Sequence, residues 1–314
     1  MKFIDALNGC NRGAPPVWLM RQAGRYLPEY QALRARHSLR EMFFTPKLAA
    51  EATLQPIRRF GFDAAILFSD ITAIAPAMGF ALEFREGPTV FPFATSENWR
   101  SLKQDLGALD PIAEAVLLTK KQLDIPLIGF CGGPFTIATY LAKKTWGGQD
   151  FSAFLDLIAD VCILSLQRQI AAGVDAVQIF DSWANLLNDE EFEEYSLKPL
   201  KKIAESVDKP VILFMRGSAK RAEKLAALKP AAISVDWELP ISEIRRNVKI
   251  PLQGNINPDL LFSPADQVRR EVRTLLDEMQ GDPAFIVNLG HGVKPGTPLE
   301  AIEALVEEVR KLNY

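Results

Sequence analysis

The chain has 314 residues, of which 48% are hydrophobic and 24% charged, and its formal net charge is −3. These values are typical of a globular protein with a large core, and the lack of a basic block in the sequence argues against nucleic acid as a partner. No run approaches about 18 uninterrupted apolar residues, so the sequence predicts no membrane span.

The cysteines and the start of the chain indicate a compartment. Cys10, Cys131 and Cys162 are odd in number and far apart, which argues against a disulfide framework. The opening residues, MKFIDALNGC, lack the long apolar stretch of a signal peptide. We therefore expect a cytoplasmic protein with reduced cysteines.

Short β-rich segments alternate with longer amphipathic segments, which is typical of βα units around a parallel sheet. The sequence predicts helices at Asp189–Leu200, from an N-cap at Ser263 to Met279, and at about Pro298–Lys311. Eight strands are predicted, at Pro16–Met20, Ala64–Phe68, Leu127–Phe130, Ala176–Phe180, Val211–Met215, Ile233–Asp236, Leu252–Asn255 and Phe285–Asn288.

Two intervals are longer than a plain βα unit needs. Met20 to Ala64 contains an arginine-rich turn and is expected to hold two helices, and Asp70 to Leu127 contains a Pro/Gly-rich stretch from Pro76 to Pro92. Long insertions after barrel strands usually build the wall or cap of an active site. We therefore predict an α/β fold: one (β/α)8 barrel domain over residues 1–314, with insertions after strands one and two.

An open, doubly wound sheet is the alternative fold. Such a sheet typically carries a glycine-rich phosphate-binding turn after its first strand. Here the first predicted strand is followed by Arg21-Gln22-Ala23-Gly24-Arg25 instead. This run favours the barrel.

In a barrel, the groups that do chemistry lie just past the C-terminal ends of the strands. Arg21 and Arg25 follow strand one, and a spacing of four places them on one face of a helical turn, able to hold two carboxylates. Arg34 is a possible third positive group. An isolated pair of this kind is more often a surface salt-bridge pair, but its place after a strand favours a binding site.

Four further polar residues follow strands, each with an ordinary structural alternative. Asp70 ends an apolar run, where it can stabilise a cation or simply cap a helix. His291 lies between glycines and can act as a donor or acid, or bond a loop carbonyl. Tyr140 lies in an apolar stretch that is more often core, and Ser182 can cap the helix after strand four.

Other kinds of site have little support in the sequence. It contains no His/Cys cluster with zinc spacing, no P-loop, no dinucleotide fingerprint and no G-x-S-x-G elbow. We therefore predict neither metal nor cofactor. Arginines, an aspartate, a tyrosine and a histidine suit acid-catalysed chemistry on a polyanion.

The strand-end residues belong to longer motifs that match a known family. The run PPVWLMRQAGRYLPEY at 15–30 resembles the N-terminal signature of the uroporphyrinogen decarboxylases almost letter for letter. The second signature is similar to GFCGGPFT at 129–136. Shorter matches are FSDI at 68–71, FDSWA at 180–184, VDW at 235–237, LQGN at 252–255 and GHG at 290–292. The resemblance extends from about Ala14 to Thr297.

The resemblance implies a (β/α)8 barrel that forms a homodimer with facing clefts and uses no cofactor. It implies that Asp70 accepts hydrogen bonds from the pyrrole NH groups of uroporphyrinogen. The other residues that it places against this tetrapyrrole are Arg21, Gln22, Ala23, Gly24, Arg25, Arg34, Tyr140, Ser182 and His291.

The reaction implied by the resemblance converts the four acetate side chains of uroporphyrinogen III to methyl groups, giving coproporphyrinogen III in heme biosynthesis. Our hypothesis is that protonation of a ring carbon makes the pyrrole a cationic electron sink. We assign catalytic roles to Asp70, Arg21, Tyr140 and His291. The identity of the acid stays open among Arg21, Arg25 and His291.

Three positions depart from the family pattern. Asn185 replaces a glycine, Arg216 replaces a common lysine, and Lys143-Lys144-Thr145-Trp146 replaces a glycine-rich acidic loop. None of them removes a residue with an assigned catalytic role. Two alternatives remain: a corrinoid/thiol methyltransferase of the same barrel family, although no His-x-Cys pair is present, and a non-catalytic tetrapyrrole-binding protein.

Overall fold

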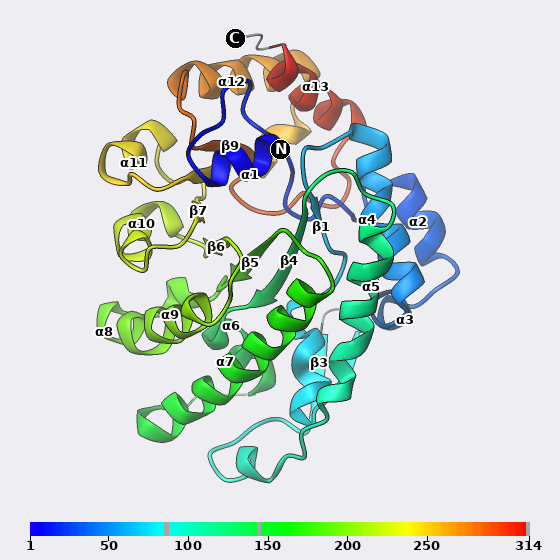
Figure 1. Ribbon diagram of the computed structural model, residues 1–314, viewed down its shortest axis with the longest axis vertical. Helices are drawn as coiled ribbons and strands as arrows, with labels where there is room; N and C mark the ends of the chain where they lie inside the picture. The colour runs from blue at the N-terminus through cyan, green and yellow to red at the C-terminus, as the bar shows by residue number, and fades with distance from the viewer. Residues whose placement is uncertain (85–87, 143–145, 312–314) are drawn as a thin grey trace.

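Seven parallel strands form one curled sheet at the centre of the molecule (Figure 1). The computed structural model describes residues 1–84, 88–142 and 146–311. Within them the strand order is β1-β4-β5-β6-β7-β8-β9, so each strand of the sheet pairs with the strand that follows it in the sequence of this sheet. The strands are β1 (Ala65–Ile66), β4 (Leu127–Gly132), β5 (Ala176–Phe180), β6 (Val211–Phe214), β7 (Ala232–Ser234), β8 (Leu252–Ile256) and β9 (Phe285–Leu289).

The segment at residues 16–20 joins the two ends of this sheet. Val17 forms a parallel bridge with Val287, where the Val287 N–H donates to the Pro16 carbonyl at 2.9 Å. On its other side, the Asp63 N–H donates to the Val17 carbonyl at 2.8 Å, just before β1. The segment therefore takes the place of an eighth strand between β9 and β1.

The prediction of a regular strand at Pro16–Met20 is nevertheless wrong, because the segment makes only that one bridge. Pro16 has no N–H, and the Val17 N–H donates to the Asp63 carboxylate at 2.8 Å instead of to a strand. The other seven predicted strands are present, and no end differs by more than two residues from that of the structure.

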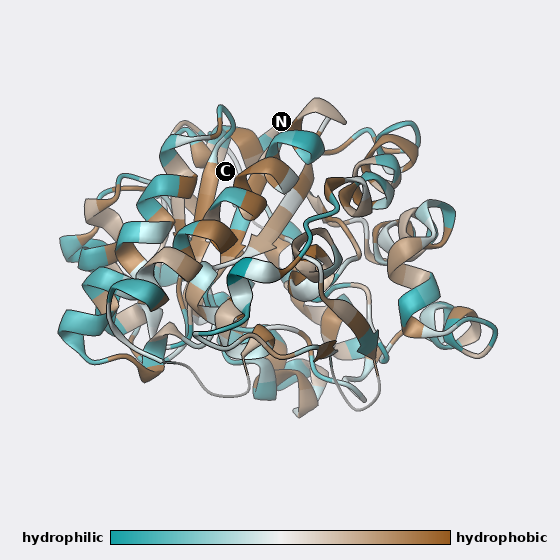
Figure 2. Ribbon diagram, turned by 90° about the horizontal axis from the view of Figure 1, so that it is seen from below, coloured by the Kyte–Doolittle hydropathy of each residue, from teal (hydrophilic) through white to brown (hydrophobic). Residues whose placement is uncertain are grey.

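Helices surround the sheet on its outer side (Figure 1). Figure 2 shows the strands as a brown hydrophobic centre, while teal residues lie mainly on the outer helices. The helices are α1 (Lys2–Leu7), α2 (Pro28–Arg34), α3 (Leu39–Phe44), α4 (Pro46–Phe60), α5 (Asp110–Lys120), α6 (Pro134–Leu141), α7 (Gly148–Ala171), α8 (Asp189–Phe192), α9 (Lys198–Glu205), α10 (Ser218–Ala227), α11 (Ile241–Asn247), α12 (Ala265–Glu278) and α13 (Leu299–Arg310).

The first long interval holds three helices, α2, α3 and α4, where two were expected. Local sequence signals mark the starts of both α3 and α4, so each boundary between these helices has a clear cause. Ser38 and Glu41 form a reciprocal capping box that starts α3, and Pro46 occupies the first turn of α4. The second interval contains a 3-10 helix, η1 (Ile71–Met78), and a hairpin of β2 (Ala81–Phe84) and β3 (Pro88–Phe91).

Two other helix predictions need small corrections. The N-cap of α12 is Pro264 rather than Ser263, because the extended backbone continues through the proline. The predicted helix at Asp189–Leu200 is helical throughout, but a π-helical turn at Glu193–Leu197 separates α8 from α9. The final helix matches its prediction within one residue at each end.

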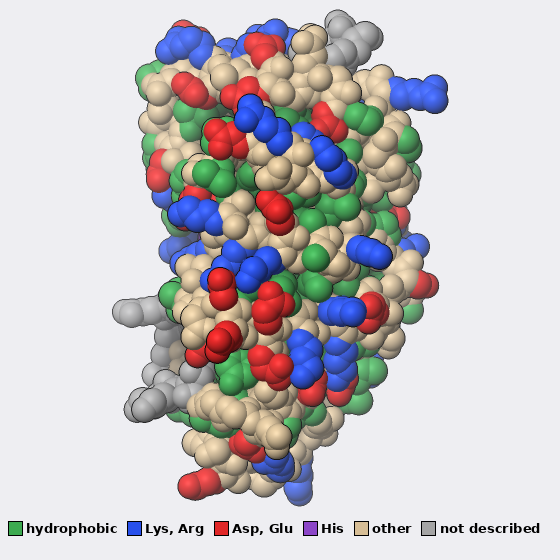
Figure 3. All heavy atoms as spheres, turned by 90° about the vertical axis from the view of Figure 1, so that its left-hand side faces the viewer, with side chains coloured by type: hydrophobic (Ala, Val, Ile, Leu, Met, Phe, Trp, Pro, Cys, Tyr) green, Lys and Arg blue, Asp and Glu red, His purple; other side chains and the backbone are tan. Residues whose placement is uncertain are grey.

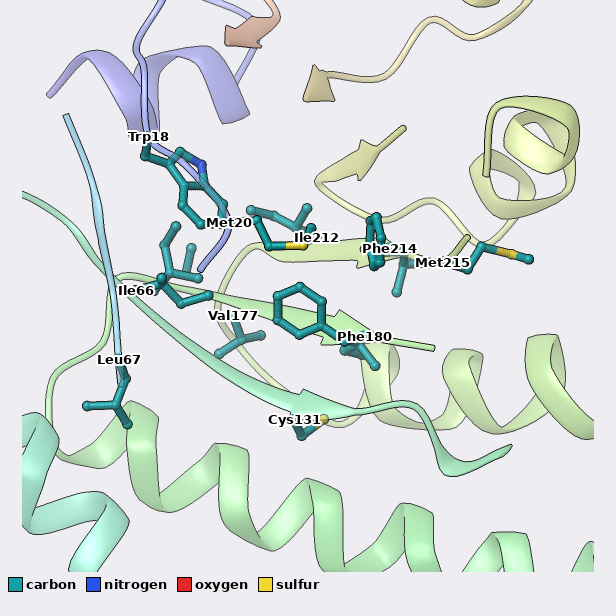
Figure 4. Close-up of a cluster of buried hydrophobic side chains, with 14 of the residues drawn as sticks. Trp18, Met20, Ile66, Leu67, Cys131, Val177, Phe180, Ile212, Phe214 and Met215 are labelled. Atoms are coloured by element: carbon teal, nitrogen blue, oxygen red, sulfur yellow. The ribbon is translucent and has the colours of Figure 1, made fainter. Parts of the chain in front are cut away.

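Large apolar side chains fill the space between the strands. Figure 4 shows Met20, Ile212, Phe180 and Phe214 gathered there, below Trp18. The indole Nε1 of Trp18 donates to Gln253 at 2.9 Å, so this fully buried ring keeps its polar atom paired. The barrel interior is therefore a packed core below the strand ends rather than a channel.

No helix in the described residues is long and apolar enough to cross a bilayer. The face of the molecule that carries α8, α10 and α11 shows lysine and arginine side chains interspersed with aspartate and glutamate (Figure 3). That face has no single-sign field that would steer a highly charged polymer.

Candidate active site

A cleft with two lobes opens at the C-terminal ends of the strands. The first lobe has a volume of about 370 Å³, and its floor is apolar where β1, β4, β5 and β6 end. The second lobe has a volume of about 470 Å³ and lies beyond β6, β7 and β9. Arg21 and His291 line both lobes. The polar residues that line the first lobe are Arg21, Gln22, Arg25, Tyr26, Tyr30, Ser69, Asp70, Ser182 and His291.

The segment at residues 16–20, which closes the barrel and is called the closing segment, presents Arg21 to this cleft. Just before it, the Met20 N–H donates to the Asn288 side chain at 2.9 Å, and the Val293 N–H donates to the Met20 carbonyl at 2.8 Å. The chain then turns sharply, and Arg21 has a φ of 60°, a left-handed conformation that costs a non-glycine residue about 1 kcal/mol or more. Strain of this size at a cleft residue is typical of a functional site.

Gly292 makes room for the Arg21 side chain. A Cβ at position 292 would lie 2.3 Å from the Arg21 Cδ, which is far inside van der Waals contact. The guanidinium remains accessible to solvent through the cleft, yet protein atoms surround it densely, and this desolvation lowers its pKa. The negative charge of Asp70 opposes that effect but does not cancel it.

Asp70 follows β1 and serves two purposes at once. Its Oδ1 accepts hydrogen bonds from the Thr72 N–H, at 2.8 Å, and from the Thr72 hydroxyl, so it caps η1 as one interpretation of the sequence expected. Its Oδ2 accepts none from a described residue and is left for a ligand in the first lobe. Burial raises the pKa of this carboxyl, while the Thr72 hydrogen bonds and the Arg21 charge act in the opposite direction.

His291 lies between the lobes on the loop after β9. Its ring packs edge-on against Phe214 with centroids 5.7 Å apart, and it makes no hydrogen bond to a described loop carbonyl, contrary to the structural alternative. Burial and the positive charges of Arg21, Arg216 and Lys294 lower its pKa to about 4. The imidazole is therefore neutral at physiological pH.

This shift makes the stability of the protein depend on pH. Between pH 6.5 and 4 the unfolded histidine binds a proton that the folded one resists, so the free energy of unfolding falls as pH falls through this window, by up to about 3 kcal/mol for this residue. His291→Asn should remove this contribution. Urea unfolding at pH 7, 5 and 4 measures it, with His37→Asn as the matched control; equal pH slopes in wild type and His291→Asn would contradict the prediction.

The other residues of the arginine motif also lie at the first lobe. Gln22 is fully buried and its amide donates to the Ala64 carbonyl at 3.4 Å, which ties the motif to the start of β1. Ala23, Gly24 and Arg25 line the lobe. The turn is not helical, but it still brings Arg21 and Arg25 to one cavity, and neither forms an ion pair with a described residue.

Ser182 lines the first lobe and makes no capping hydrogen bond, since Trp183 is the N-cap of the short helix that follows. Tyr140 lies outside the residues that line the lobes. Its half-buried side chain accepts a hydrogen bond from Trp183 Nε1 at 3.2 Å through the hydroxyl oxygen. Arg34 also lies outside that lining, at the end of α2, where its guanidinium donates to the His37 carbonyl.

Sequence reasoning missed the second lobe as a site. Arg216, Asp236, Trp237, Glu238 and Lys294 line it, and the sequence analysis assigned none of them to the site. A signal was available, because the predicted strands six and eight end next to Asp236-Trp237 and Gly290-His291, and neighbouring strand ends share one edge. Of the loop at Lys143-Lys144-Thr145-Trp146, the first three residues lie outside the described residues.

The family model for uroporphyrinogen decarboxylase (URO-D) matches residues 1–312. The chain belongs to the uroporphyrinogen decarboxylase family. It is 44% identical over 332 residues to a uroporphyrinogen decarboxylase of Protochlamydia amoebophila, covering 99% of this chain and 91% of that protein. A second relative with the same name, from Chelativorans sp., is 40% identical over 339 residues, covering 99% and 98%.

Membership in the uroporphyrinogen decarboxylase family confirms the predicted resemblance and the predicted carboxy-lyase class. A methyltransferase from Methanosarcina mazei shares the fold, with a TM-score of 0.84 at 22% identity over 99% of this chain and 97% of that one. Together with the curled sheet whose two ends the segment at residues 16–20 joins, this likeness confirms the barrel over the open sheet. Among residues 1–84, 88–142 and 146–311, no cluster of three or more His, Cys, Asp and Glu side chains is placed to hold a metal ion.

Proposed function

We propose that the protein decarboxylates the four acetate side chains of uroporphyrinogen III, giving coproporphyrinogen III, by acid catalysis without a cofactor. The observation that carries the proposal is the charge pattern of the cleft. Asp70 faces an apolar lobe with one free carboxylate oxygen, while Arg21, Arg25 and Arg216 line the cleft without an ion-pair partner among the described residues. Such a site suits an apolar ring system with NH donors inside and carboxylates around its edge.

The chemistry needs an electron sink, because loss of CO2 from an acetate on a neutral pyrrole would leave a carbanion. A proton added to the ring carbon beside the acetate makes the pyrrole cationic, and the C–C bond electrons then flow into the ring as CO2 leaves. A second proton then adds to the exocyclic carbon, which becomes the methyl group. The ring carbon finally loses the proton that was added to it in the first step. Each cycle thus exchanges one CO2 for one proton.

Asp70 stabilises the cationic ring through its NH groups in this scheme. Apolar side chains line much of the first lobe, so a tetrapyrrole that fills the lobe displaces water from it and strengthens this effect. Arg21 and Arg25 hold carboxylates, and Ser182, Tyr140 and Arg34 stay proposed contacts, the last two from outside the cavity lining.

Of the three candidate acids, Arg21 and His291 line both lobes of the cleft, whereas Arg25 lines only the first. His291 is neutral at physiological pH, so a proton on it is scarce. Arg21 keeps its proton, and desolvation lowers its pKa and makes it a stronger acid than an ordinary guanidinium. We therefore assign proton delivery to Arg21 and a neutral hydrogen-bonding role to His291.

The test is anaerobic incubation of the metal-stripped protein with uroporphyrinogen III in dim light, followed by oxidation and chromatography. A ladder of seven-, six-, five- and four-carboxylate porphyrins supports the proposal. Tight binding with no loss of carboxylate supports a non-catalytic binding protein. Absence of binding points to methyl transfer in the same barrel family, and methyl transfer between a corrinoid and a thiol is then assayed with added zinc.

We further propose that residues 1–314 form one domain and that the protein acts in the cytoplasm as a homodimer with facing clefts. One buried core runs from Phe3 to Val309, which supports the single domain. Two apolar side chains, Leu186 and Trp237, remain 67% and 40% exposed on the loops beside the second lobe. A partner covering this mouth would remove them from water.

Leu186→Asp should convert the dimer to monomer, because it places a charge in the proposed apolar contact. Sedimentation velocity at micromolar concentration measures the change. Leu117→Asp on α5, where the side chain is 47% exposed, is the matched control and should leave the dimer intact. A monomeric wild-type protein, or equal dissociation by both variants, would overturn the proposed interface.

A further inference from the structure

Arg216 is a cation held over an aromatic ring in the second lobe. It follows β6, and its guanidinium carbon lies 4.7 Å from the centre of the Trp183 ring. This cation–π contact restrains the guanidinium, whose N–H groups form no ion pair with a described residue. Because the Arg216 side chain is already restrained, it loses little further conformational entropy when a planar anion binds.

The acidic residues of the lobe do not neutralise Arg216. Glu238 is engaged by Lys220, with its carboxylate oxygen 2.7 Å from the Lys220 Nζ. Asp236 accepts the Glu238 N–H at 3.1 Å and forms no ion pair with a described residue. Arg216 is therefore left with an unpaired fork of donors facing the cleft, the geometry that carboxylates satisfy bidentately.

The position of Arg216 relative to the first lobe limits what it can bind. Arg21 and His291 separate the two lobes, and the charge of Arg216 is close enough to lower the pKa of both. A ligand with one pyrrole over Asp70 and a body larger than the first lobe must extend past Arg21 and His291. Its far side chains then reach Arg216.

We propose that Arg216 binds a propionate carboxylate on a ring other than the one being decarboxylated, and thereby selects the substrate and its intermediates. This inference rests on the proposed function. Each turnover removes an acetate, so a fixed cation that serves all four steps must hold the side chains that persist. Arg216 is then a specificity residue that acts through binding rather than through the bond-breaking step.

Steady-state kinetics of Arg216→Met and Arg216→Lys test the proposal on the intact protein. Loss of a charge-assisted bidentate contact should raise the KM of Arg216→Met about 10-fold or more, equally for the octacarboxylate and pentacarboxylate porphyrinogens. Arg216→Lys retains the positive charge but not the two parallel N–H donors, so its KM should lie between those of the wild type and Arg216→Met. Lys201→Met on α9, with a side chain 59% exposed, removes the same charge outside both lobes and is the matched control.

Three results would overturn the proposal. They are an unchanged KM, a loss confined to kcat, and a KM effect on the octacarboxylate alone, which would assign Arg216 to an acetate. Equilibrium binding of uroporphyrin, the oxidised octacarboxylate, by tryptophan quenching needs no turnover and is measured in parallel. If wild type binds but does not react, the proposed function fails, and weaker binding by Arg216→Met still supports the subsite; unaltered binding rejects it.

Discussion

Asp70→Asn should lower kcat by about 10³-fold while the protein stays folded. The amide keeps the shape of the side chain and an oxygen that can accept the Thr72 N–H, so η1 keeps its cap. It loses the negative charge that stabilises a cationic pyrrole bound in the largely apolar first lobe, and one preorganised group of this kind is typically worth about 10²–10³-fold. Anaerobic turnover of uroporphyrinogen III and circular dichroism measure the two effects.

Asp105→Asn is the matched control for this change. Asp105 caps the short 3-10 helix at Leu106–Leu109, accepting the Gly107 N–H at 3.1 Å, and does not line the cleft. The variant should retain wild-type kcat within about twofold, as expected for an exposed cap. If Asp70→Asn were as active as Asp105→Asn, the central role of Asp70 would be refuted.

Arg21→Gly should abolish turnover, by about 10³-fold or more in kcat/KM, without loss of stability. The variant removes both a carboxylate contact and the proposed acid. It also relieves a left-handed backbone at φ 60°, which glycine adopts freely, and it removes a desolvated charge. The free energy of unfolding should therefore stay the same or rise by about 1 kcal/mol.

Lys229→Gly separates backbone strain from chemistry. Lys229 has a φ of 54° and is the other described non-glycine residue with a positive φ. Its replacement should stabilise the protein by a similar amount and leave kcat/KM unchanged, since Lys229 lies on the loop before β7 and lines neither lobe. A large loss of stability in Arg21→Gly alone would mean that the Arg21 side chain holds the closing segment in place.

The barrel and much of the first lobe could be predicted from the sequence because their signals are local. Strand ends such as Phe68 to Asp70 combine an apolar run with a polar terminus, and parallel strands bring those termini to one edge. Ser182 and His291 were placed at the cleft by that rule alone. The capping box at Ser38 and Glu41 is an equally local signal. It was not used, and the sequence therefore predicted two helices in this interval instead of three.

Other features depend on contacts that no short segment specifies. Arg34 was grouped with Arg21 and Arg25 on sequence proximity, but α2 directs it to the His37 carbonyl. The second lobe depends on loops after three different strands meeting at one place. The closing segment is held by residues near positions 63 and 287, so its irregular pairing follows from distant partners rather than from its own composition.

The closing segment also has a consequence for biosynthesis. Residues 16–20 emerge from the ribosome well before β9, yet their bridge to Val287 and the hydrogen bond from Met20 to Asn288 need residues made some 270 positions later. Contacts of such separation form late, because a very long loop must close first. Arg21 therefore lacks the contacts that fix its place in a nascent chain without β9, and we expect every such copy to be inactive.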